Sequence, residues 1–136
     1  MKGNLVIELE GNKINLSLFP CGFVFNNQTL RKASIPPEQS VTKVITVENK
    51  ANYESMPYEE GTLIIYSHGY FSPDERAFLI HLERVLSSIR TSCGTTYLHT
   101  GDLDYGGVKI FQYIKKRIFP NLQPYLMDTQ THEQYK

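Results

Sequence analysis

The spacing of apolar residues changes its character near residue 42. Residues 3–18 hold two runs in which apolar and polar positions alternate, on either side of Gly11-Asn12, and this pattern is typical of a β-hairpin. An irregular stretch with several prolines follows, and beyond it apolar runs are separated by segments of helical period. We therefore expect three segments: a hairpin with a lead-in over residues 1–41, a main domain over residues 42–130 and a tail over residues 131–136.

Within the main domain, strand-like and helix-like patterns take turns. Strands are predicted over residues 42–47, 62–67, 95–100 and 121–127, and helices over residues 49–55, 73–90 and 107–119. Strands that alternate with helices indicate a parallel sheet with right-handed crossovers. Pro124 confines the last strand to an edge or a bulge, because proline has no N–H to give to a ladder. The expected fold class is α/β, with a mainly parallel four-stranded sheet flanked by helices and preceded by the hairpin.

The longest predicted helix has a clear beginning. Ser72 and Glu75 have the spacing of a capping box, and Pro73 stands at the first helical position, where its missing N–H costs little. The apolar face of this helix is predicted to comprise Phe78, Leu82, Val85, Leu86 and Ile89.

Length and composition limit the possible partners. At 136 residues the chain is long enough for one domain with a proper core. Cys21 and Cys93 are too few for a disulfide framework. No apolar stretch is long enough for a membrane span, and residues 1–20 lack the features of a secretory signal, so we expect no membrane partner and a cytoplasmic location. A formal net charge of zero is unlike a free-standing DNA-binding domain, so most affinity for DNA would come from elsewhere.

Three acidic residues directly follow predicted strands. They are Glu48 after the first sheet strand and Asp102 and Asp104 after the third. In extended chain Asp102 and Asp104 would point to opposite faces, so they converge only in a turn, for which Gly101 and Gly106-Gly107 supply backbone freedom. Open parallel sheets bind ligands beyond the carboxyl ends of their strands. Because Mg²⁺ needs only one or two carboxylates besides waters and phosphate oxygens, the three acids are candidates for a metal site.

Each acid also has a structural explanation. Glu48 alone is explained as a solvated residue at a strand end, and aspartate before glycine is common in turns. Asp102 and Asp104, however, repel each other when both are ionised unless a cation lies between them. As an ordered set, the three acids favour metal binding.

Two histidines and a further aspartate are second-rank candidates. His68 and His99 fall near the carboxyl ends of predicted strands, where a histidine orients a metal-bound water, contacts a phosphate or serves as a satisfied structural residue. Asp128 follows the last strand, where it would complete the acidic cluster or cap the segment after it.

Three cations are candidates for contacts with phosphate. Lys50 and Arg76 each lie at the start of a predicted helix on the side of the acids. Lys109 lies away from the apolar side of the last helix, where a solvated helix face is the simpler explanation.

The order of these features resembles the Toprim domain, the metal-binding fold shared by topoisomerases, primases and some nucleases. That pattern has a glutamate after the first sheet strand and Asp-x-Asp after the third, and V-E-N-K and G-D-L-D-Y-G-G match it. The turn Y-S-H-G-Y-F-S-P is similar to a glycine-containing loop in the A subunits of type IIB topoisomerases. The chain also resembles the C-terminal Toprim domain of the JetD family, the nuclease subunits of Wadjet anti-plasmid defence, whose V-E-N, G-D-x-D-x-x-G and L-M-D elements all have counterparts here.

The resemblance implies a nuclease that cleaves DNA phosphodiester bonds, with Glu48, Asp102 and Asp104 holding Mg²⁺ or Mn²⁺. It implies double-stranded DNA as a partner, and an upstream DNA-binding domain or a partner subunit such as an SMC-like complex, with a homodimer as a possible assembly. The topoisomerase relatives carry a tyrosine on a separate winged-helix domain, which this chain is too short to contain upstream. We therefore expect a catalytic fragment or a reduced relative.

Two other classes stay open. A metal-dependent phosphatase or a glycosyltransferase can carry Asp-x-Asp after a strand, but such phosphatases have their nucleophilic aspartate after the first strand, where this chain has Glu48. A non-catalytic DNA-docking or assembly module would use the same acids to hold a structural ion.

Overall fold

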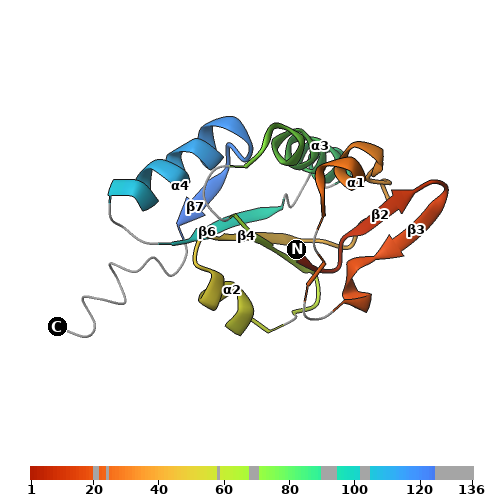
Figure 1. Ribbon diagram of the computed structural model, residues 1–136, viewed down its shortest axis with the longest axis horizontal. Coiled ribbons are helices and arrows are strands. Elements are labelled where there is room, and N and C mark those ends of the chain that lie inside the picture. Colours follow the sequence, from red (N-terminus) through yellow and green to blue (C-terminus); the bar gives the residue numbers. More distant parts are fainter. Residues whose placement is uncertain are drawn as a thin grey trace.

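The computed structural model describes residues 1–19, 22–23, 25–57, 59–67, 71–89, 95–101 and 105–124, with the backbone alone at positions 105 and 106. These residues form a five-stranded sheet with helices on both faces, beside a small two-stranded sheet (Figure 1). The α/β class that the sequence predicts is confirmed.

Four strands of the main sheet run parallel, as the apolar runs predict. They are β4 (Lys43–Val47), β5 (Thr62–Tyr66), β6 (Thr96–Thr100) and β7 (Leu122–Pro124). The residues of β4 and β5 are nearly all buried, which explains why their sequences are almost continuously apolar. β7 lies at one edge of the sheet, so Pro124 sits where no further strand needs its missing N–H.

A fifth strand, β1 (Lys2–Gly3), extends the sheet beyond the four predicted strands. It pairs antiparallel with β5 and gives the order β1-β5-β4-β6-β7. Gly3 makes this pairing possible, because its φ is 139° and a Cβ at this position would overlap the carbonyl oxygen of Thr62. A two-residue strand of this kind has no period that sequence patterns can show.

The predicted hairpin is present, with its turn one residue earlier than expected. β2 (Val6–Leu9) pairs with β3 (Asn12–Asn15), and Leu9 lies opposite Asn12. The two-residue turn is therefore Glu10-Gly11, where φ is 51° and 84°, and Asn12 already belongs to the second strand. Positive φ at both central residues is the geometry that matches the twist of paired strands.

The lead-in after the hairpin contains two short helical elements that the sequence patterns do not show. They are the 3₁₀ helix η1 (Leu16–Leu18) and α1 (Asn27–Lys32). The side chain of Asn26 accepts a hydrogen bond from the Thr29 N–H and caps α1.

The three predicted helices of the main domain are confirmed, with shifts at their ends. They are α2 (Lys50–Ser55), α3 (Pro73–Ile89) and α4 (Tyr105–Arg117). The capping box of α3 is formed in both directions: the Ser72 N–H donates to Glu75 Oε1 at 2.7 Å, and the Glu75 N–H donates to Ser72 Oγ at 3.2 Å. None of the described helices combines the length and apolar character needed to cross a bilayer.

The helices divide between the two faces of the sheet (Figure 1). α1, α3 and α4 cover one face and share the larger core cluster, which includes Leu79, Leu82 and Ile114. α2 covers the other face, where Ile45, Val47 and Ile64 form a smaller cluster. In α3 the buried position next to Phe78 is Leu79, whereas Ile89 is 37% exposed, so its assignment to the apolar face is wrong.

The crossovers create a switch point between β4 and β6. From β4 the chain passes through α2 to β5 on one side, and from β5 it returns over the opposite face through α3 to β6 on the other side of β4. In open parallel sheets the crevice at such a point, beyond the carboxyl ends of the strands, is where ligands bind.

Candidate functional site

The carboxyl ends of the central strands are tied together by backbone hydrogen bonds. The Glu48 N–H donates to the Thr100 carbonyl oxygen at 3.0 Å, and the Ser67 N–H donates to the Val47 carbonyl oxygen at 2.8 Å. Glu48 therefore lies at the same edge as the end of β6, directly before G-D-L-D. Asp102 and Asp104 lie outside the described residues, so the convergence of all three carboxylates stays a prediction.

Gly101 leaves the space into which two polar side chains project. A Cβ built on Gly101 would collide with Glu48 Oε2 and lie only 3.0 Å from His99 Nε2. Gly101 is buried, and its φ is outside the positive range, so the space taken by these two side chains is a steric reason for glycine here. The turn for which the sequence predicts its backbone freedom lies outside the described residues. The Glu48 carboxylate and the His99 ring edge thus face one small volume.

His99 is a fully buried polar residue within this edge. Its Nδ1 lies 2.6 Å from Thr46 Oγ1 on the neighbouring strand, and its Nε2 has no hydrogen-bond partner among the described residues. The ring lies 5.7 Å from that of Phe111 on α4. Burial lowers the pKa of His99 to about 4, because a charged imidazolium would lose its hydration. The ring is therefore neutral near neutral pH.

Thr46 is a site residue that the sequence analysis missed. It is fully buried in β4 and lies opposite His99 in the strand register. The only trace in the sequence is a hydroxyl within the apolar run V-I-T-V, a position at which strand formers such as threonine are common. Its partner His99 can be identified only once β4 and β6 are known to be neighbours.

The three predicted cations lie on helices. Lys50 is the first residue of α2 and is exposed, and Lys109 is exposed on α4. Arg76 Nη1 donates to Tyr113 Oη at 3.4 Å, so its side chain links α3 to α4. Phosphate contacts by these three cations stay predictions. His68 and Asp128 lie outside the described residues.

The residues at this edge suit a hard divalent cation. Carboxylate oxygens are the ligands that Mg²⁺ and Mn²⁺ prefer, and Glu48 presents one beside the buried Nε2 of His99, which has no hydrogen-bond partner in the described part of the chain. Within the described part of the chain no three histidine, cysteine or acidic side chains are grouped closely enough to hold an ion.

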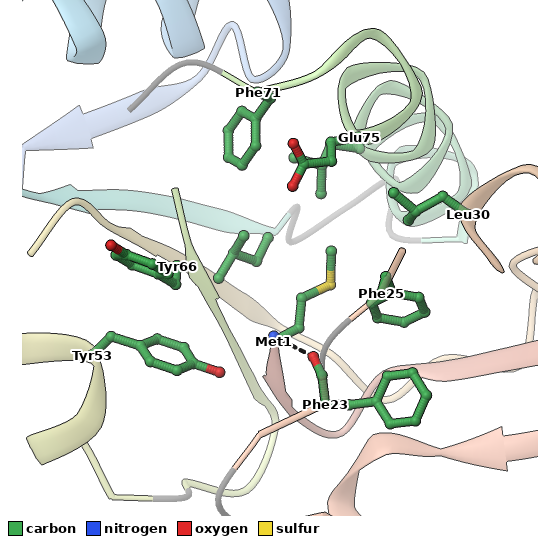
Figure 2. Close-up of a pocket in the computed structure, with 10 residues that line it drawn as sticks. Met1, Phe23, Phe25, Leu30, Tyr53, Tyr66, Phe71 and Glu75 are labelled. Atoms are coloured by element: carbon green, nitrogen blue, oxygen red, sulfur yellow. Dashed lines mark hydrogen bonds between the residues drawn. The ribbon is translucent and has the colours of Figure 1, made fainter. Parts of the chain in front are cut away.

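A separate apolar hollow of about 220 Å³ lies by β1 and the end of β5 (Figure 2). Figure 2 shows Met1 in its middle, with Phe71 and Glu75 on one side and Tyr53 and Tyr66 on another. The amino group of Met1 donates to the Phe23 carbonyl oxygen at 2.9 Å. Its lining includes neither Glu48 nor His99, so this hollow is distinct from the switch point.

Fold and site together define a class: a mainly parallel α/β domain with a carboxylate and a buried histidine at its switch point. The chain belongs to the family described as Wadjet protein JetD, C-terminal, whose model matches residues 4–136. The family resemblance drawn from the sequence motifs is thereby confirmed.

A curated relative and a solved structure show the extent of the likeness. Wadjet protein JetD from Bacillus cereus (strain Q1) is 34% identical over 136 residues, which cover 99% of this chain and 32% of that protein. The chain thus spans about a third of the length of this relative. A small TOPRIM domain protein from Bacillus stearothermophilus is similar over 62% of this chain and 64% of its own, with 23% identity and a TM-score of 0.40.

Proposed function

We propose that this domain cleaves DNA phosphodiester bonds with the help of Mg²⁺ or Mn²⁺, as the nuclease part of an anti-plasmid defence protein of the JetD type. The observation that carries the proposal is the position of Glu48. In a chain of the JetD C-terminal family, this carboxylate lies at the switch point, directly beside the strand that leads into G-D-L-D.

The chemistry follows from the donors at this edge. Glu48, Asp102 and Asp104 would hold the cation, which when bound activates water and neutralises charge on the phosphate. The sheet holds the backbone of Glu48 in place through its hydrogen bond to Thr100. Lys50, two residues further on at the start of α2, would contact a flanking phosphate.

The partners proposed follow from the length of the family relative. Double-stranded DNA is the substrate, and the DNA is positioned by an upstream domain or by a partner subunit such as an SMC-like complex. The net charge of zero supports this division of labour, since the domain has no cationic excess with which to hold DNA alone. A homodimer and a cytoplasmic location also stay proposals.

Cleavage of supercoiled plasmid by the purified chain tests the proposed function. We expect slow nicking that requires Mg²⁺ or Mn²⁺ and is abolished by a chelator. The Glu48→Gln variant, which keeps the shape of the side chain, should lose the activity. The control Glu54→Gln changes an exposed glutamate on α2 and should cleave like the native chain.

Two results would contradict the proposal. Undiminished nicking by Glu48→Gln would show that this carboxylate has a structural role. Metal binding without any cleavage would instead favour a DNA-docking or assembly module that holds a structural ion.

A further inference from the structure

We propose that His99 is a positioning residue for Glu48: its ring carries a proton on Nε2 and directs this N–H donor at the Glu48 carboxylate, directly or through one water. The assignment of the proton rests on the contacts of His99 with Thr46 and on the space that its ring shares with the Glu48 carboxylate. Its consequence for metal binding and cleavage rests on the proposed function.

The position of the ring is fixed by the pairing of β4 with β6. Thr46 and His99 lie opposite each other in these parallel strands, and Thr46 Oγ1 is 2.6 Å from His99 Nδ1. Both side chains are fully buried. One ring nitrogen therefore has a partner in the sheet, and the other is left for the switch point.

The Thr46 hydroxyl decides which ring nitrogen is protonated. This hydroxyl has one proton, and its oxygen lies 2.6 Å from Nδ1 and 3.4 Å from the Leu98 carbonyl oxygen. The shorter separation has the geometry of a strong O–H donor bond, whereas the longer one is near the limit of a hydrogen bond. Thr46 therefore donates to Nδ1, and the neutral ring keeps its own proton on Nε2.

The direction of Nε2 supports the same assignment. Nε2 and Glu48 Oε2 both face the space above Gly101, and Nε2 has no partner within the described part of the chain. A lone pair on Nε2 would face the negative carboxylate, whereas an N–H there forms a charge-assisted hydrogen bond. A buried donor without a partner is costly, and the Glu48 carboxylate, which faces the same space, would satisfy it.

These contacts form a series that leads from the sheet to the acid. Thr46 in β4 orients His99 in β6, and His99 orients Glu48 at the end of β4. Hydrogen bonds from behind a ligating carboxylate fix its direction, and loss of such a partner commonly weakens metal binding by about tenfold or more. His99 thus acts through Glu48, without touching substrate.

The first test reads the ring proton directly. Nitrogen NMR of the histidine rings in the metal-free chain should show His99 neutral, with its proton on Nε2. In Thr46→Val, which removes the hydroxyl and keeps the shape, the share of the Nδ1-protonated form should rise, because the donor that opposes it is gone. A ring with its proton on Nδ1 in the native chain would overturn the assignment.

The second test uses two amides that imitate different ring nitrogens. In His99→Gln the side-chain N–H₂ reaches the position of Nε2, whereas in His99→Asn it reaches only that of Nδ1. Calorimetric titration with Mn²⁺ should show His99→Gln within a few-fold of the native affinity and His99→Asn weaker by about tenfold or more. Plasmid nicking should follow the same order.

The outcomes separate the two proposals. Absence of Mn²⁺ binding and nicking in the native chain would overturn the proposed function and leave the NMR result to decide the assignment of the proton. Equal Mn²⁺ affinity in the native chain and in a folded His99→Asn variant would overturn the positioning role. If His99→Asn does not fold, Thr46→Val takes its place. Native Mn²⁺ affinity in Thr46→Val, with the ring proton moved to Nδ1, would likewise overturn the positioning role.

Discussion

At the scale of single residues, the main feature of the switch point is the close packing of two side chains against Gly101. The Glu48 carboxylate and the His99 ring edge occupy the space that a side chain at position 101 would need. Glu48 can swing away, because its carboxylate is the far end of a flexible side chain, but His99 is fully buried and cannot. An added methyl group should therefore displace the acid and leave the fold standing.

The Gly101→Ala variant tests this crowding. We expect a loss of stability of about 1 kcal/mol, at the low end for overpacking, together with loss of Mn²⁺ binding. Urea unfolding of Gly101→Ala in the native and Glu48→Ala backgrounds measures the coupling. A smaller cost in the Glu48→Ala background is expected, because the clashing carboxylate is gone, whereas equal costs would show that the two residues do not interact.

The buried imidazole of His99 also makes stability depend on pH. Its pKa in the folded chain is about 4, below the ordinary value of 6.5, so between these values the unfolded chain binds a proton that the folded chain does not. The buried neutral ring therefore makes its full contribution to the free energy of unfolding above pH 6.5. As the pH falls toward 4, this free energy decreases by on the order of 3 kcal/mol.

Urea unfolding of the metal-free chain at several pH values checks this. His99→Gln should flatten the fall in stability across the interval. The control His81→Gln, at an exposed position on α3, keeps the buried imidazole and should keep the fall. If the free energy of unfolding of His99→Gln fell with pH as steeply as that of the native chain, the pH dependence would come from another group.

At the scale of elements, the sequence patterns predict well those helices and strands that are buried or capped. β4 and β5 are covered on both faces of the sheet, so their apolar runs reveal them. The start of α3 is revealed by the spacing of its capping-box residues. β1 and η1 are missed because two or three residues show no period. The exposure of Ile89 is missed because the packing neighbours of a helix end are not encoded in its own spacing.

The capping box of α3 gives a prediction at this scale. Ser72→Ala removes the acceptor for the Glu75 N–H and should lower the free energy of unfolding by about 1 kcal/mol. The control Ser88→Ala changes an exposed serine in the last turns of the same helix and should have little effect. Equal effects of the two changes, measured by urea unfolding, would show that the cap contributes nothing specific.

At the scale of the whole molecule, topology explains which part of the site was predictable. Parallel strands end at one edge, so Glu48 could be placed at the same edge of the sheet as the end of β6 from the element order alone. The link from Thr46 to His99 could not, because it depends on β4 and β6 being neighbours although β5 and α3 lie between them in sequence. The steric role of Gly101 depends on the same neighbourhood.

The balance of charge predicts how the molecule meets DNA. With a formal net charge of zero, the chain should bind duplex DNA weakly, with an affinity that falls as salt rises. Fluorescence anisotropy over a range of salt concentrations gives the log–log slope. Lys50→Gln should reduce this slope by about one, whereas Lys13→Gln, whose native lysine pairs with Glu38 beside the hairpin, should not. A slope insensitive to Lys50 would remove it from the DNA contact.

The most direct test of the account is whether a divalent cation binds where β4 and β6 end. The melting temperature of the native chain should rise with added Mn²⁺, because an ion that binds only the folded state stabilises it by mass action. The Glu54→Gln control should rise equally, while Glu48→Gln and the double variant Asp102→Asn, Asp104→Asn should not respond. An equal rise in all four proteins would place the ion elsewhere and contradict the account.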